Sequence, residues 1–102
     1  PGSNPDPAEI QRTYQIRARI NQQLGNVRAQ AADLSEAIRR LDDLDAIEAT
    51  NPYLFAERAS ARMKLREWDG AADDALRAEI EFGQIGDKIR KLLASADAAL
   101  AL

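Results

Sequence analysis

The stretch 64–78 constrains the fold of this 102-residue chain more than any other part of it. A helical pattern ends near Leu65, a short polar turn follows, and a second helical pattern begins at Trp68. Small side chains then recur at Ala71, Ala75 and Ala78. Their spacings of four and three place them on one face of a helix, where another helix can approach closely. The stretch therefore predicts the elbow of an αα-hairpin.

Helical periodicity extends over the rest of the chain, and no alternating strand pattern interrupts it. Alanine is abundant, β-branched residues are few, and the prolines lie before residue 8 apart from Pro52. This composition predicts an all-α fold. The expected helices span about 8–24, 28–49, 52–65, 68–82 and 88–101. Their expected boundaries are Asp6-Pro7, Gly25-Asn26, Asn51-Pro52 with Asn51 as a cap, the break Gly83-Gln84-Ile85-Gly86, and Asp87 as the cap of the last helix.

Two parts of the chain match each other at a constant offset, because 65 − 24 and 55 − 14 both equal 41. The segment Leu24-Gly25-Asn26-Val27 corresponds to Leu65-Arg66-Glu67-Trp68. Upstream of the two turns, Tyr14, Arg17 and Ala18 correspond to Phe55, Arg58 and Ala59. A constant offset across two helices indicates an internal repeat.

These residues resemble the tetratricopeptide repeats, whose pattern runs from an aromatic residue through Leu-Gly to a turn, Ala-x-x-x-Phe and a further Ala. In the second copy the pattern falls on Phe55, Arg58-Ala59, Arg62, Trp68, Ala71, Ala75 and Ala78. In the first it falls on Tyr14, Arg17-Ala18, Asn21, Leu24-Gly25, Val27, Gln30, Leu34 and Ala37. Gln30 and Ala75 depart from the pattern, and the repeat of 41 residues exceeds the family length of about 34. The resemblance covers about residues 9–82.

The resemblance implies a short right-handed α-solenoid of two αα-hairpins plus a C-terminal capping helix. Residues 1–7 are then a disordered lead or tag remnant, and 8–50 form a first hairpin with an elongated second helix. Residues 51–82 form the second hairpin, and 87–102 form the capping helix or the first helix of a truncated third repeat. The additional residues fall before Pro52, so that 42–50 are either helix or ordered loop.

Composition excludes several kinds of chemistry. The chain has no histidine and no cysteine, which removes the usual general base, thiolate and metal ligands. We therefore expect no catalytic, cofactor or metal site, and interpret Asp42-Asp43 and Asp73-Asp74 as solvated helix faces and Trp68 as core packing. A net charge of −3 disfavours nucleic-acid binding, and no apolar run is long enough to span a membrane. The absence of cysteine favours an intracellular or organellar protein.

Charge is segregated between the expected helices. The first helix of each hairpin, and the last helix, carry more basic than acidic residues, whereas the second helices are acidic. In tetratricopeptide arrays the first helices line a concave groove, so the resemblance implies a basic groove that binds an acidic peptide. The groove residues it implies are Arg12, Gln15, Arg19, Gln22, Gln23, Tyr53, Ala56, Glu57, Ser60, Met63, Lys64, Arg90, Lys91 and Ala94. Alternatively, the opposite charges pair between neighbouring helices.

We therefore predict a non-catalytic protein-interaction scaffold, an assembly factor or an adaptor. A chaperone-tail clamp is disfavoured, because Glu57 stands at a clamp position and would repel an acidic tail. A second hypothesis is homo-oligomerisation through residues 92–102, which are apolar on more than one face where a terminal repeat helix should be polar outside.

Overall fold

The computed structural model describes residues 6–45 and 49–100, with side chains as far as Ala94 in the last helix. The described part contains α1 (Pro7–Gln23), α2 (Val27–Arg39), the short 3-10 helix η1 (Arg40–Asp43), α3 (Pro52–Lys64) and α4 (Trp68–Leu100). The predicted all-α class is confirmed. The predictions for residues 1–5, 46–48 and 101–102 lie outside the described residues.

α1 and α3 both begin at the predicted prolines. Asp6 caps α1, since its side chain accepts a hydrogen bond from the Ala8 amide at 3.1 Å. Asn51 is the N-cap residue of α3, as predicted, but its side chain makes no hydrogen bond to the first turn of α3. Its side-chain nitrogen instead donates to Oε1 of Gln15 in α1 at 3.5 Å. Asn51 is therefore turned toward the neighbouring helix.

α2 is not elongated, and in this respect the sequence prediction is wrong. It ends at Arg39, and η1 then carries the chain to Asp43. Aspartate is a poor helix former, and Asp42 and Asp43 would place negative charge at the negative end of the helix dipole. Leu41 is buried in the core and fixes η1 there. The additional length of the first repeat therefore lies in η1 and the connection that follows it.

The turns of the two helix pairs have the same backbone structure. Gly25 has a φ of +76° and Arg66, 41 residues later, has a φ of +63°. In the first turn the Asn26 amide donates to the carbonyl of Asn21 at 2.8 Å. In the second the Glu67 amide donates to the carbonyl of Arg62 at 2.9 Å. The internal repeat inferred from the sequence is therefore present in the backbone hydrogen bonds.

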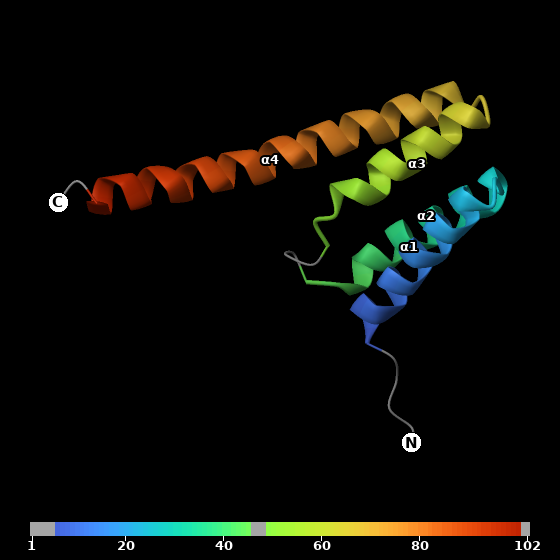
Figure 1. The fold of residues 1–102 in the computed structure, drawn as a ribbon, viewed down its shortest axis with the longest axis horizontal. Coiled ribbons are helices and arrows are strands. Elements are labelled where there is room, and N and C mark those ends of the chain that lie inside the picture. The colour runs from blue at the N-terminus through green and yellow to red at the C-terminus, as the bar shows by residue number, and fades with distance from the viewer. Residues whose placement is uncertain (1–5, 46–48, 101–102) are drawn as a thin grey trace, which may run out of the picture.

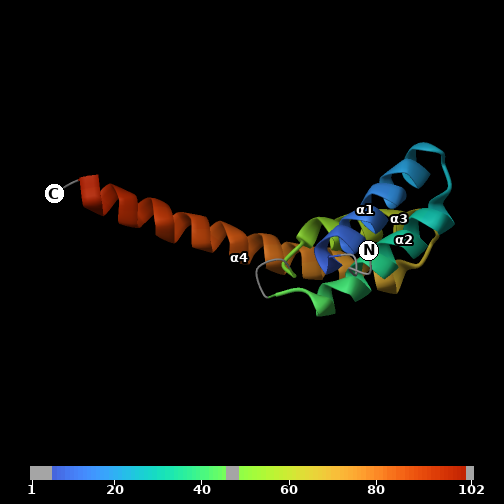
Figure 2. The same ribbon diagram turned by 90° about the horizontal axis from the view of Figure 1, so that it is seen from below.

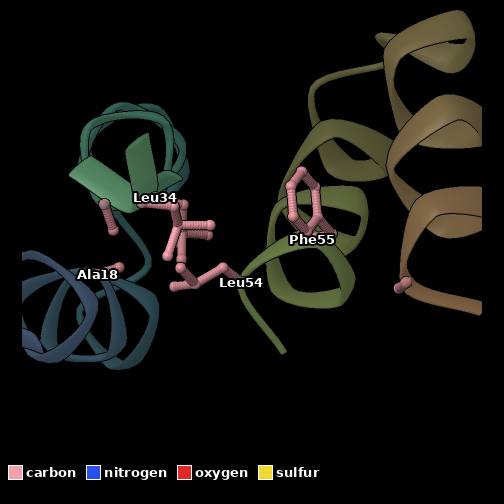
Figure 3. Close-up of a cluster of buried hydrophobic side chains, with 7 residues drawn as sticks. Ala18, Leu34, Leu54 and Phe55 are labelled. Atoms are coloured by element: carbon pink, nitrogen blue, oxygen red, sulfur yellow. The ribbon is translucent and has the colours of Figure 1, made fainter. Parts of the chain in front are cut away.

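α1 packs on α2, α2 packs on α3, and α3 packs on α4 (Figure 1). The core lies between these helices, with Leu34 of α2 beside Leu54 of α3 and Ala18 of α1 adjacent to them (Figure 3). α3 has a helix on both sides, and its Leu54 and Ala61 are fully buried. The equivalent positions in α1 are Thr13 and Ile20, and both are exposed. α1 therefore lacks the second neighbour that α3 has.

The predicted break at 83–86 and the separate capping helix at 87–102 are wrong, because α4 is continuous from Trp68 to Leu100. Glycine costs about 1 kcal/mol in a helix interior but, unlike proline, leaves the backbone hydrogen bonds intact. α3 has 13 residues and α4 has 33, so that α4 continues beyond α3. Its second half projects from the molecule, and residues 87–94 are exposed (Figures 1 and 2).

Candidate partner-binding surface

The predicted binding residues of α1 and α3 meet at Glu57. Arg19 Nε donates to Oε1 of Glu57 at 3.0 Å, and Gln15 Nε2 donates to Oε2 at 3.3 Å. Gln15 also interacts with Asn51, which immediately precedes α3. Side chains from two helices separated by about 40 residues of chain therefore form one polar surface.

Further predicted residues are exposed on the same two helices. They are Arg12, Gln22 and Gln23 on α1, and Tyr53, Ser60, Met63 and Lys64 on α3. We call these residues, together with Gln15, Arg19 and Glu57, the α1–α3 surface. Within the described part of the chain, Arg12 and Lys64 have no carboxylate within ion-pair distance. Their charges are therefore available to a partner.

Arg90 and Lys91 are separated from the α1–α3 surface. Both lie on the half of α4 that projects from the molecule (Figure 1). Arg90 interacts locally, with an Asp87 carboxylate oxygen at 3.0 Å and the Gly86 carbonyl at 3.4 Å. The family resemblance implied that these residues lie on a third helix lining the groove. Because α4 is one continuous helix, Arg90 and Lys91 instead belong to the same helix as Trp68.

The strongest polar cluster lies between α3 and α4. Arg58 donates two hydrogen bonds to Asp74, both at 2.8 Å, and Arg62 Nη1 donates a third at 3.0 Å. The Asp74 side chain is 5% exposed. The interpretation of Asp74 as part of a solvated face is therefore wrong. A buried carboxylate with this many charged donors stabilises the packing of the two helices, since removing one member would leave uncompensated charge.

The same cluster occurs 41 residues earlier, between α1 and α2. Asn21 Nδ2 donates to Asp33 at 2.8 Å, and Arg17 Nη2 lies 3.6 Å from the other Asp33 oxygen. Arg17, Asn21 and Asp33 are thus the counterparts of Arg58, Arg62 and Asp74. Sequence reasoning missed both clusters. The 41-residue offset, applied to the acidic residues as well as to the apolar ones, would have paired Asp33 with Asp74.

Aromatic contacts repeat at the same offset. The Arg17 guanidinium lies 5.6 Å from the centre of the Tyr14 ring, and that of Arg58 lies 6.0 Å from the centre of the Phe55 ring. Cations at such distances interact favourably with ring faces. Trp68 does not follow the prediction of core packing, because it is 57% exposed. Trp68 is the first residue of α4 and follows the turn after Lys64, the last residue of α3.

The segregated charges pair between neighbouring helices, as the alternative interpretation of the sequence predicted. Arg17 pairs with Asp33, Arg58 and Arg62 pair with Asp74, and Arg19 pairs with Glu57. Much of the basic charge of α1 and α3 is therefore neutralised within the fold. Arg12 and Lys64 carry the remainder on the α1–α3 surface.

One carboxyl group has a clearly altered pKa. A hydrogen bond from Arg39 lowers the pKa of Glu36, and Arg40 acts in the same direction. Glu36 lies on α2, away from the α1–α3 surface.

Among the described side chains no group of three or more His, Cys, Asp or Glu residues is arranged to hold a metal ion. None of the helices, as far as the chain is described, is long and apolar enough to cross a membrane.

No protein-family model, curated protein or solved structure matches this chain. The resemblance to tetratricopeptide repeats therefore rests on the residues of this chain and stays a prediction.

Proposed function

We propose that this chain is a non-catalytic protein-interaction module of tetratricopeptide type, in which two helix pairs stack as a short solenoid. Three observations support this proposal. The turns at Gly25 and Arg66 have the same backbone, the clusters around Asp33 and Asp74 are equivalent, and each helix packs on the next. A repeated helix pair cannot bury its apolar face alone, so stacking is the arrangement that such a unit requires.

The occupant of the α1–α3 surface is proposed to be an acidic peptide segment. The observation that carries this proposal is the position of Glu57, whose carboxylate accepts hydrogen bonds from Arg19 and Gln15. Two donors of α1 are thus already arranged around one carboxylate of α3. A glutamate or aspartate of a partner would compete for Arg19 while Arg12 and Lys64 attract it over longer range. Exposed Tyr53 and Met63 supply apolar contact on the same surface.

Binding of a synthetic peptide of alternating glutamate and leucine tests the proposal, with a lysine–leucine peptide as the matched control. We expect the acidic peptide alone to bind, measured by fluorescence anisotropy. Arg12→Glu combined with Arg19→Glu should weaken binding about tenfold, since two attractive charges become repulsive. The control variant Arg28→Glu with Arg66→Glu makes the same change in net charge at exposed positions outside the surface, and it should bind nearly as well as the wild type.

Glu57→Gln provides the opposite test. The substitution removes the internal competitor of the partner carboxylate and leaves Arg19 unpaired, so we expect tighter binding of the acidic peptide. Equal weakening by both arginine double variants would show that net charge, and not the α1–α3 surface, governs binding. No change in affinity with Arg12→Glu and Arg19→Glu would contradict the proposed site.

A further inference from the structure

A second exposed surface runs along α4 as far as its side chains are described, beside the face that α3 covers, and one of its members, Phe82, contacts α3 through an edge-to-face contact with Tyr53 at 5.0 Å. α3 covers the face of α4 that carries Ala71, Asp74, Ala78 and Glu81, all of which are buried. Beside this face, residues recur at alternating spacings of four and three. They are Trp68, Ala72, Ala75, Glu79, Phe82, Gly86, Ile89 and Leu93, and the spacing continues in the sequence to Ala96 and Leu100. We call this row the α4 seam.

The α4 seam has the repeat of a two-stranded coiled coil. Alternating steps of three and four residues keep one row of side chains facing a second helix over several turns. Every member as far as Leu93 is exposed except Gly86, which is half-buried. Four of these residues are large and apolar, namely Trp68, Phe82, Ile89 and Leu93. A row of this kind in contact with water is typical of a helix surface that takes up a partner.

The charges beside the seam differ between the two halves of α4. The first half carries exposed Asp69 and Asp73 beside the seam and Glu79 within it, against one exposed cation, Arg77, whereas the second carries exposed Lys88, Arg90 and Lys91 against Asp87. Two copies of α4 side by side in the same direction would place like charges together. Two copies in opposite directions place the acidic half of each against the basic half of the other, which favours association and fixes its direction.

In the same orientation, two pairs of seam positions combine a large and a small residue. With a two-fold axis near residue 84, Phe82 lies opposite the partner's Gly86, and Ala75 lies opposite the partner's Leu93. Each large side chain of these two pairs then meets a small one. Glu79 lies opposite the partner's Ile89 and next to the partner's Arg90, whose present ion pair with Asp87 is highly exposed and contributes little.

From this self-complementarity we infer that a second copy of this chain occupies the α4 seam, giving an antiparallel homodimer. A helix of 33 residues is about 50 Å long, which provides a contact along two full helices. The projecting half of α4 is covered in this arrangement. An isolated helix as long as this half is only marginally stable in water. A second copy would pack against the part of α4 that α3 does not contact. The inference does not require peptide binding on the α1–α3 surface, although Tyr53 of that surface contacts Phe82 of the seam.

Molar mass in solution, measured by sedimentation equilibrium over a range of concentrations, tests the dimer. We expect twice the mass of the chain at high concentration. Ile89→Glu should give the monomer, because it removes an apolar contact and places a carboxylate opposite the partner's Glu79. Ile80→Glu is the matched control, since Ile80 lies on the same helix outside the seam and the two isoleucines are 50% and 51% exposed. That control should remain dimeric.

Leu93→Glu is a second seam variant, further from the hairpin core, and circular dichroism shows whether each variant retains its helices. A wild-type monomer at every concentration would overturn the inference. So would a dimer that withstands both Ile89→Glu and Leu93→Glu, or one that Ile80→Glu dissociates equally.

Disulfide cross-linking tests the direction of pairing, with no background because the chain has no cysteine. Ala75→Cys together with Leu93→Cys should give covalent dimers on mild oxidation. Ala75→Cys alone should not, because in the antiparallel arrangement the two copies of position 75 lie far apart. Efficient cross-linking of the single variant would instead show parallel pairing and contradict the inference.

Discussion

Asp33 and Asp74 occupy equivalent positions 41 residues apart, and each lies between the two helices of its pair, yet their partners differ. Asp74 is held by Arg58 and Arg62, whose side chains are 15% and 26% exposed. Asp33 is held by Asn21 and by Arg17, whose side chain is 60% exposed. α3 and α4 thus share a buried cluster with two cationic donors, whereas in α1 and α2 the Asp33 carboxylate has one neutral amide donor and one peripheral cation. The same backbone repeat therefore holds its helices together with unequal strength.

The largest effect is expected when the acidic residue of each cluster is neutralised. Asp74→Asn leaves the Arg58 guanidinium without its counter-charge and Arg62 with only the exposed Glu67, 3.8 Å away, and should lower the free energy of unfolding by about 3 kcal/mol. Asp33→Asn should cost about 1 kcal/mol, because Arg17 is mostly solvated and the hydrogen bond with Asn21 can be kept by an amide. Urea unfolding followed by circular dichroism measures both variants. Equal losses would show that the two clusters do not differ in strength.

The two turns allow an intermediate test, because residues with positive φ can be exchanged between them. Gly25→Arg should lower the free energy of unfolding by about 1 kcal/mol, since a side chain disfavours the left-handed conformation. No atom lies within 4 Å of a Cβ added at Gly25, so that crowding does not contribute. Arg66→Gly should raise the free energy by a similar or smaller amount, because glycine relieves the backbone but has more freedom when unfolded.

The same unfolding experiment reports on both turn variants. A gain from Gly25→Arg or a loss from Arg66→Gly would show that the two turns are not equivalent in energy, in spite of their common hydrogen bonds.

The smallest effect concerns an ion pair whose charges are reversed between the repeats. Glu36 of α2 pairs with Arg40 of η1, and the equivalent positions on α4 hold Arg77 and the buried Glu81. Because the hydrogen bond from Arg39 lowers the pKa of Glu36 in the folded chain, its contribution to stability is present above the unfolded pKa. That contribution is lost as the pH falls through the lower, folded pKa.

Chemical-shift titration of the Glu36 carboxyl group, in wild type and in Arg39→Gln, checks this expectation. The variant should titrate at higher pH. An unchanged midpoint would show that Arg39 is not the cause of the lowered pKa.

Much of the fold followed from the sequence, and the failures have local causes. The turns, the prolines at the start of α1 and α3, and the repeat were predictable, because glycine, proline and alanine spacings act through the backbone. The end of α2 and the continuity of α4 were not predictable. The low helix propensity of Asp42-Asp43 and Gly83 disfavours a helix only weakly, and packing then determines whether the helix continues. The contact of Gln15 and Arg19 with Glu57 was missed because it depends on how two helix pairs stack, and no local pattern encodes that geometry.

The position of α3 between two other helices also determines the order in which the helices unfold. Amide hydrogens of α3 can reach solvent only when neighbours on both sides move away, so their exchange requires nearly the whole free energy of unfolding. α1 packs on α2 and η1 and reaches α3 through the side chains around Glu57, and within the described part of the chain the projecting half of α4 packs on no other helix. Partial unfolding therefore proceeds from the two ends toward the middle, and native-state hydrogen exchange would find the slowest amides in α3.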